Sequence, residues 1–151
     1  MEISYCCAAR QGDVLGLQRK QLLNEGIYIK QGKTNKAQIK RWTPRLKAAV
    51  ELALKQQVTH NLLYVFADPK GNKVSAVRLR HWYAAAKAQA QAANPTMKID
   101  FTYHDIKAKS ISDWTGDKQK FSGHKTAAQV AVYDRKTQVV DSHDYGKNNK
   151  R

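Results

Sequence analysis

Six residues of this chain carry side chains that could together perform chemistry on a phosphodiester. One is a tyrosine, which can act as a nucleophile, and the others are basic side chains that can bind phosphate oxygens or move a proton. Transesterification at phosphorus needs a nucleophile in line with the leaving oxygen, positive donors around the other oxygens and an acid for the departing 5′ hydroxyl. The six are dispersed along the sequence: Arg10, Lys33, His104, Lys107, His124 and Tyr133.

The composition of the chain indicates an anionic polymer as its partner. Its 151 residues include 27 Lys and Arg against 12 Asp and Glu, a formal net charge of +15, which is more than solubility requires. Nucleic acid is the first expectation, and an anionic membrane surface is the alternative. No segment is long and apolar enough to span a bilayer, and no secretory signal opens the chain. We therefore expect double-stranded DNA as the partner and no membrane association.

Motifs for metals and cofactors are missing from the sequence. It has no Walker loop, no dinucleotide glycine fingerprint and no paired cysteines of the zinc-finger kind. The absence of ligand-spaced Asp, Glu and Cys clusters argues against a metal-dependent nuclease. The two cysteines, Cys6 and Cys7, are adjacent and poorly placed for a disulfide, which favours a reducing, cytoplasmic compartment. We expect neither a cofactor nor a metal ion.

The first half of the chain must position Arg10 and Lys33. Apolar residues in segment 3–17 are interrupted at Arg10 and predict two short helices joined there. Segment 26–39 has β-prone residues on both sides of a Gly-Lys-Thr-Asn-Lys turn, so it predicts a β-hairpin with Lys33 near its tip. Thr43-Pro44 then predicts the cap and the first turn of an amphipathic, packed helix.

The second half must position the remaining four residues. After a turn at residues 68–71, a long helix is predicted over about 75–93. Segment 104–114 has no helix breaker and predicts a helix on which the first histidine and Lys107, three residues apart, project from one face. A loop over residues 121–126 then begins a helix that carries Tyr133 near its end.

Five segments, in this order, resemble the motifs of the tyrosine recombinase (phage integrase) family. Residues 9–17, Ala-Arg-Gln-Gly-Asp-Val-Leu-Gly-Leu, resemble its first box, in which an acidic residue follows the Arg three places on. Lys33 matches its hairpin lysine, and residues 104–107, His-Asp-Ile-Lys, resemble its His-x-x-Arg box. Residues 122–126, Ser-Gly-His-Lys-Thr, resemble its Gly-His box, and residues 131–133, Ala-Val-Tyr, its nucleophile segment. The match covers nearly the whole chain.

The resemblance implies an α+β, mainly helical catalytic domain of the tyrosine recombinase type, with a small antiparallel hairpin or sheet on one edge. It implies site-specific DNA recombination or integration, as in a phage or mobile-element integrase of a bacterial host. Tyr133 is then the nucleophile, and the 3′-phosphotyrosine intermediate keeps the bond energy, so that neither ATP nor a metal is required. The implied partners are attachment-site DNA and further copies of the chain, in a tetramer at the synapse.

Residue chemistry and the resemblance together suggest a role for each side chain. Arg10 can hold phosphate with its planar guanidinium, and His104 and His124 can donate hydrogen bonds or shuttle the tyrosine proton. Lys33 is the general acid that the resemblance implies. Asp13 lies one helical turn from Arg10, where it is expected to pair with the guanidinium and orient it.

Lys107 stands where the family usually has Arg. A lysine ammonium is a point charge on a flexible stem, whereas a guanidinium is a planar fork that binds two oxygens. Losing one charge-assisted bond in the transition state costs about 1.5–3 kcal/mol, or one to two decades in rate. We therefore expect reduced activity. Lys109 lies two residues further on and points away, so it cannot substitute.

Other residues of the same types have simpler explanations. Lys30 and Lys36 are alternatives to Lys33 on the hairpin. Trp114, between the two histidine motifs, is expected to belong to the core. Three histidines lie outside the motifs and are expected to be structural or exposed: His60, His81 and His143.

The chain is expected to form one catalytic domain over residues 1–140, followed by a mobile polar tail over residues 141–151. Proteins of this family carry a separate helical core-binding domain ahead of the catalytic one. This chain begins nine residues before Arg10, so we expect that domain to be absent and the first catalytic helix to be truncated. The resemblance also implies that such a tail can dock on a neighbouring copy.

Three other functions stay open on the sequence alone. The main alternative is a catalytically impaired, DNA-binding remnant of an integrase, in which the motifs survive only as parts of the fold. A basic RNA-binding module is the second, although the usual RNA motifs are missing. The third is a type IB topoisomerase, which shares much of the chemistry but relaxes DNA as a monomer.

Overall fold

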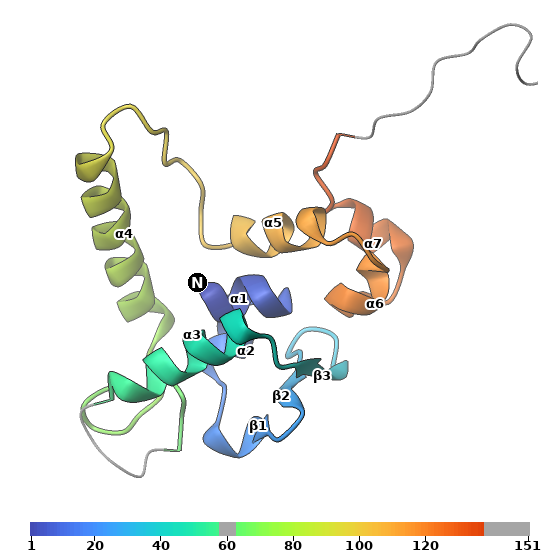
Figure 1. The fold of residues 1–151 in the computed structure, drawn as a ribbon, viewed down its shortest axis with the longest axis horizontal. Coiled ribbons are helices and arrows are strands. Elements are labelled where there is room, and N and C mark those ends of the chain that lie inside the picture. The colour runs from blue at the N-terminus through green and yellow to red at the C-terminus, as the bar shows by residue number, and fades with distance from the viewer. Residues whose placement is uncertain (58–62, 138–151) are drawn as a thin grey trace, which may run out of the picture.

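The computed structural model describes residues 1–57 and 63–137, and it shows a mainly helical protein with a small antiparallel sheet on one side (Figure 1). The predicted fold class is confirmed. The predicted tail over residues 141–151, as well as His60 and His143, lies outside the described residues.

Two short helices open the chain, α1 (Glu2–Cys7) and α2 (Gln11–Leu15), and they meet at Arg10 as predicted. α1 ends at Ala8, whose φ of 50° and ψ of 36° are left-handed, and the backbone is then extended at Arg10, the N-cap of α2. This change of direction turns the chain sharply while Ala8 stays fully buried. A short 3-10 helix, η1 (Arg19–Gln21), leads on to the sheet.

The sheet has three antiparallel strands in the order β1 (Leu22–Leu23), β2 (Gly26–Lys30) and β3 (Ala37–Arg41). Residues alternate along β2, so that Ile27 and Ile29 are buried while Tyr28 is exposed. A side chain at Gly26 would meet the carbonyl of Lys40 at 2.1 Å, which explains glycine at this close crossing. β2 and β3 form the predicted hairpin, and Lys33 lies in its connecting loop.

Helix α3 (Pro44–Lys55) packs on α1 and closes the main core. The Thr43 side chain accepts a hydrogen bond from Leu46 N at 3.2 Å, so the predicted cap is confirmed. Leu46 and Val50 follow at helical spacing and are buried. The main core gathers apolar residues from both short helices, the sheet and α3: Ile3, Cys7, Ala9, Val14, Leu17, Ile27, Ile29, Leu46, Val50 and Val65.

Helix α4 (Ala76–Ala93) differs from the others because it has no buried residue. Its bounds agree with the prediction: Ser75 caps the start, and Asn94 ends it. In Figure 1 it stands to one side of the body, with a long connection to the next helix. Trp82 and Val77 are among its exposed apolar residues. None of the helices in the described part of the chain is long and apolar enough to cross a membrane.

Three helices form the last part of the fold: α5 (Asp105–Asp113), α6 (Lys118–Ser122) and α7 (Ala127–Ala131). α6 falls partly in the segment predicted as a loop, because Asp117 caps its start and Gly123, with φ of 68°, ends it. Thr126 caps α7. The prediction that Trp114 belongs to the core is wrong, since it is 45% exposed and stacks on Phe121 with ring centroids 4.3 Å apart.

Candidate active site

Arg10 lies in the bend between α1 and α2 and reaches the hairpin loop. Its Nη1 donates a hydrogen bond to Oε1 of Gln31 at 2.8 Å. The predicted pairing of Arg10 with Asp13 is not what the structure has. Asp13 Oδ1 instead accepts a hydrogen bond from Gly32 N at 2.9 Å. Because Arg10 is the extended N-cap of α2 and not one of its helical residues, the spacing of three residues does not align the two side chains.

Lys33 lies in the hairpin turn, and its side chain is exposed. In the part of the chain that the structure describes, no hydrogen bond or ring contact joins it to the other five candidate residues. Two main-chain hydrogen bonds close the loop that carries it, from Gln31 N to Lys36 O and from Asn35 N to Gln31 O. The loop is also tied to Arg10 through Gln31. The structure therefore places Lys33 beside the site but not in contact with it.

Lys107 is one of two buried members of the set. It lies on α5, its side chain is only 2% exposed, and its Nζ has no hydrogen-bond partner among the described residues. Burial, followed by repulsion from Arg10, lowers the pKa of this ammonium to about 8. Lys109, in contrast, is exposed and pairs with Asp113, so its predicted direction away from the site is confirmed.

A small cavity of about 50 Å³ connects Arg10 to this helix. Arg10, His104 and Lys107 line it, together with Ala9, Gln11 and Tyr103. His104 is exposed and lies at the start of α5. Three basic side chains thus surround one small hollow, which is an arrangement that suits an anionic oxygen.

His124 lies in the loop between α6 and α7 and is buried. Its Nδ1 is hydrogen-bonded to Ser122 Oγ at 2.7 Å, and its Nε2 is buried without a partner in the described chain. Burial first, and then the charges of Lys107 and Arg10, lower the pKa of the imidazole to about 4. The ring is therefore neutral at pH 7. When the serine hydroxyl donates to Nδ1, Nε2 carries the hydrogen and can donate it to an anion.

Tyr133 joins these groups. Its ring stacks on His124 with centroids 4.8 Å apart and an interplanar angle of 26°. The ring of His104 is 5.8 Å away, and Lys107 Nζ lies 5.6 Å from the tyrosine centroid. These residues come from three separate elements, α5, the α6–α7 loop and the turn after α7. The structure thus brings five of the six predicted residues into one neighbourhood.

The residues that follow Tyr133 hold it in place. Ser112 Oγ donates to Tyr133 O at 3.2 Å and accepts from Arg135 N at 2.8 Å. Asp134 pairs with Lys118 at 2.5 Å, and the pair is about three-quarters buried. Arg135 pairs with Asp105 at 2.8 Å. The backbone of the tyrosine is therefore fixed against α5 from both sides.

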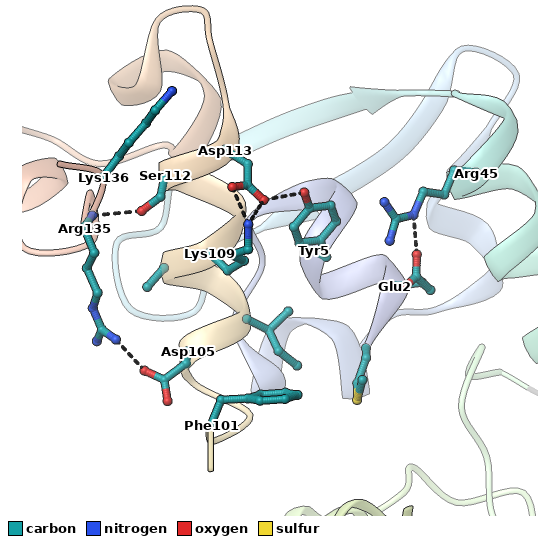
Figure 2. A pocket seen from close by; sticks show the side chains of 13 residues that line it. Glu2, Tyr5, Arg45, Phe101, Asp105, Lys109, Ser112, Asp113, Arg135 and Lys136 are labelled. Carbon is teal, nitrogen blue, oxygen red and sulfur yellow. Dashed lines mark hydrogen bonds and ion pairs between the residues drawn. The ribbon is translucent and has the colours of Figure 1, made fainter. Parts of the chain in front are cut away.

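A larger cavity of about 730 Å³ lies on another face of α5 (Figure 2). Within the described chain, its lining does not include any of the six candidate residues. Figure 2 shows pairs among its charged and polar side chains, since Lys109 and the Tyr5 hydroxyl both contact Asp113 and Arg135 contacts Asp105. Residues 1–57 and 63–137 also hold no group of three His, Cys, Asp or Glu side chains that could bind a metal ion.

Comparison with known proteins gives a result at the level of the fold. No protein-family model matches the sequence, and no curated protein matches it. Solved structures of integrases superpose over nearly all of this chain, and they show that it has a tyrosine recombinase-like fold.

The first of these structures is a lambda integrase dimer bound to a COC′ core site, with a TM-score of 0.69 and 16% identity over 93% of this chain and 53% of that one. The second is the Tn1549 transposon integrase in complex with circular intermediate DNA, with a TM-score of 0.66 and 12% identity over 90% of this chain and 52% of that one. A lambda integrase tetramer bound to a Holliday junction gives 0.69 and 15%, over 94% of this chain and 43% of that one. This tyrosine recombinase fold therefore corresponds to about half of each integrase or less.

Three polar residues of the site could not be named from their motifs. Gln31 is 4% exposed and bonds both Arg10 and Ser122 O. Ser122 fixes the ring of His124, and Ser112 fixes the backbone of Tyr133. The only sequence signal was closeness to a motif residue. Gln31 lies two residues before Lys33, and Ser122 lies two residues before His124. The contacts of Gln31 and Ser112 are with residues far away in the sequence, which periodicity does not reveal.

Proposed function

We propose that this protein cleaves and rejoins DNA by site-specific recombination, with Tyr133 as the nucleophile. The observation that carries the proposal is the position of the tyrosine ring, stacked on His124 and next to Lys107 Nζ and His104. A tyrosine on a helix end is usually a packing residue. Here its neighbours are three basic side chains, two of which have a buried nitrogen without a partner in the described chain.

In the proposed reaction, one phosphodiester enters the space lined by the basic residues. Arg10 and Lys107 bind non-bridging oxygens, and His124 donates from Nε2, so the negative charge on these oxygens in the transition state meets fixed donors. The phenol oxygen of Tyr133 attacks phosphorus and forms the 3′-phosphotyrosine bond, while the bond to the 5′ oxygen breaks. The phenol proton passes to the exposed imidazole of His104 and on to water.

Lys33 gives a proton to the departing 5′ oxygen in this scheme. The hairpin loop would have to move toward the phosphate, because the lysine side chain is exposed and not in contact with the other five residues. Rejoining is the reverse step: a 5′ hydroxyl attacks the phosphotyrosine, and the phenol leaves. Each step forms one phosphoester bond and breaks another, so the reaction consumes no energy source.

Duplex DNA is the proposed partner, with the positive charge of the chain as support. A net charge of +15 favours contacts to the phosphate backbone that do not depend on sequence. The integrases of similar fold were solved on DNA, one of them as a tetramer on a Holliday junction. We extend this to the present chain and propose that several copies assemble on DNA, in a bacterial cytoplasm and as part of a phage or mobile element.

Covalent trapping tests the proposal. The purified chain is mixed with a pool of nicked duplexes of randomised sequence, in which the short fragment beyond a cleaved bond diffuses away and leaves the phosphotyrosine. A protein–DNA adduct that survives denaturing electrophoresis is expected from the wild type. Tyr133→Phe should give none, because it removes the attacking oxygen. Tyr28→Phe is the matched control, since Tyr28 lies exposed on β2, and it should form the adduct normally.

Other outcomes decide between the rival functions. DNA binding without any adduct from the wild type would favour the impaired, DNA-binding remnant. Relaxation of supercoiled plasmid by a monomer, without strand exchange, would indicate a topoisomerase. Tighter binding to structured RNA than to duplex DNA at equal salt would favour the RNA-binding module. An adduct that persists in Tyr133→Phe would show that another nucleophile acts.

A further inference from the structure

Gln31 is an uncharged residue buried among the charged groups of the site. It is the first residue of the hairpin loop after β2, and only 4% of it is exposed. Both ends of its side-chain amide are bonded. Oε1 accepts from Arg10 Nη1 at 2.8 Å and from Thr34 Oγ1 at 3.2 Å, and Nε2 donates to Ser122 O at 2.8 Å.

These partners fix which way the amide faces. The guanidinium of Arg10 has only hydrogens to offer, so it needs the oxygen of the amide, and the carbonyl of Ser122 needs the nitrogen. A rotation of the amide by half a turn would set donor against donor and acceptor against acceptor. Because the group is buried, such a mismatch is not relieved by water. The side chain therefore holds a single orientation.

The contact with Ser122 leads directly to the second basic residue of the site. Ser122 O accepts from Gln31, while Ser122 Oγ is bonded to Nδ1 of His124. Gly123, between the two, has φ of 68°, and a Cβ there would come within 2.4 Å of Gln31 Nε2. Glycine at this position thus allows the amide to approach the backbone. Gln31 lies between Arg10 on one side and the His124 loop on the other.

Gln31 also belongs to the loop that carries Lys33. Its N–H donates to Lys36 O at 2.9 Å and its carbonyl accepts from Asn35 N at 2.8 Å. The neighbouring Gly32 N–H binds Asp13 on α2. Gln31 therefore contacts Arg10 and, through Ser122, the His124 loop, and it belongs to the hairpin loop that carries Lys33.

We propose that Gln31 is a positioning residue, which sets the guanidinium of Arg10 and the His124 loop at a fixed separation and ties the Lys33 hairpin to both. It takes over the orienting role that the sequence suggested for Asp13. The proposal rests on the proposed function only for its effect on reaction rate. The effect on the position of Arg10 can be measured without DNA.

Gln38 provides a matched control. It is a glutamine of the same hairpin, and its Nε2 donates to a carbonyl of the same helix, Lys120 O, at 2.6 Å. It also lies next to Gly123, where a Cβ would meet Gln38 Oε1 at 2.7 Å. It has no hydrogen bond to Arg10. If Gln31 only links the hairpin to α6, its substitution should have the same effects as that of Gln38. If Gln31 positions Arg10, the effects should differ.

The first experiment measures Arg10 itself by NMR, in the ¹⁵N-labelled chain without DNA. In the wild type, the Nε–H signal of Arg10 should be as rigid on the nanosecond timescale as the backbone of α2. In Gln31→Met, which removes all three side-chain hydrogen bonds at similar size, that signal should become mobile, and in Gln38→Met it should not. Burial, and then the charges of Lys107 and Arg10, lower the pKa of His124. When Arg10 becomes mobile in Gln31→Met, its charge repels the protonated imidazole less, so the pKa of His124 should rise in this variant and not in Gln38→Met.

The second experiment measures the rate of covalent adduct formation with the nicked duplex pool. Gln31→Met should slow it by about 10- to 100-fold, the size expected when a phosphate ligand shifts by about 1 Å. Gln38→Met should remain within about threefold of wild type. In an Arg10→Ala background, Gln31→Met should add little further loss, because it acts through Arg10.

The results separate this proposal from the proposed function. A wild type that forms no adduct overturns the function, while the NMR measurements still decide the role of Gln31. A mobile Arg10 signal in the wild type overturns the positioning role, even if Gln31→Met does not fold. So does an Arg10 signal that is equally rigid in Gln31→Met, or an equal loss of rate in Gln31→Met and Gln38→Met. Gln31→Glu provides a further check, since its carboxylate should keep Arg10 rigid but compete with phosphate and slow the reaction.

Discussion

Two buried regions of this protein differ in what they bury. The main core, under α3 and the sheet, consists of apolar residues such as Leu17, Ile27 and Leu46. The region between the hairpin and α5–α7 has only a small apolar cluster, built on Ala8, Ile111 and Val130. Ile106 and Ala108 of α5 are buried as well, but this region also holds most of the buried polar or charged residues: Gln31, Lys107, Ser110, Ser122 and His124.

The physical effect of burial is opposite in the two regions. In the main core, the removal of each apolar group from water stabilises the folded state. In the polar region, burial costs free energy unless a hydrogen bond or a countercharge offsets it. The comparison teaches that the main core stabilises the fold, whereas the polar region contains buried groups whose removal from water lowers the stability of the fold. Changes in the first should therefore act on folding, and changes in the second on reaction.

A change in the main core should give the largest effect on stability. Leu46 is 1% exposed, and Leu46→Ala removes most of a buried side chain. We expect the free energy of unfolding to fall by about 2–5 kcal/mol. Urea unfolding followed by circular dichroism measures this. Duplex DNA affinity, corrected for the folded fraction, should stay unchanged, and a separate loss of affinity would mean that the two regions are not independent.

The pH dependence of stability should come largely from the polar region. His124 has a pKa of about 4 in the folded chain, against an ordinary value near 6.5. Between these values the unfolded chain binds a proton there and the folded chain does not, so stability falls as the pH falls through this window. The loss should reach about 2–3 kcal/mol.

Urea unfolding across this pH range checks the assignment. His124→Gln should lose this part of the pH dependence, whereas His81→Gln should keep it, because His81 is exposed on α4. Equal pH profiles for wild type and His124→Gln would show that His124 is accessible to protons in the folded protein.

Lys107 gives a smaller effect, and it should appear in rate rather than in stability. Lys107→Arg restores a planar guanidinium that can bind two phosphate oxygens, so we expect adduct formation to be about 10- to 100-fold faster, or about 1.5–3 kcal/mol. Lys107→Met should slow adduct formation but leave the free energy of unfolding equal or higher, because it removes a buried charge.

Single-turnover adduct assays and urea unfolding of both variants measure these effects. Destabilisation by Lys107→Met would contradict the comparison, because Lys107 would then belong to the structural core. If the rate of adduct formation is unchanged in Lys107→Arg, either the lysine already binds the phosphate as well as a guanidinium does, or its surroundings admit no larger side chain.

Much of the fold could be predicted because its signals are local. Thr43-Pro44 and the segment from about Ser75 predicted two helices, and β-prone residues on both sides of the turn at residues 32–36 predicted the hairpin. α6 was missed because it has only five residues, Lys118–Ser122, and its limits depend on Asp117 and Gly123. A helix this short has too few residues for a periodic pattern.

The candidate site was predictable only in part, for a similar reason. The order and spacing of its motifs identified the residues that the structure brings together around Tyr133. Their supporting contacts join residues far apart in sequence, such as Gln31 with Ser122 or Ser112 with Tyr133. Local spacing also suggested Asp13 as the partner of Arg10, whereas Arg10 bonds Gln31 and Asp13 bonds Gly32 N. Whether Lys33 reaches the phosphate stays a prediction.

The two buried nitrogens without a partner in the described chain, Lys107 Nζ and His124 Nε2, link folding to binding. A ligand that binds only the folded chain raises stability by RT ln(1 + [L]/Kd). In the proposed complex, a DNA phosphate that contacts both nitrogens completes hydrogen bonds inside the protein, and the DNA backbone becomes a part of the protein interior. The melting temperature of this domain is then a direct measure of how much of its site is occupied.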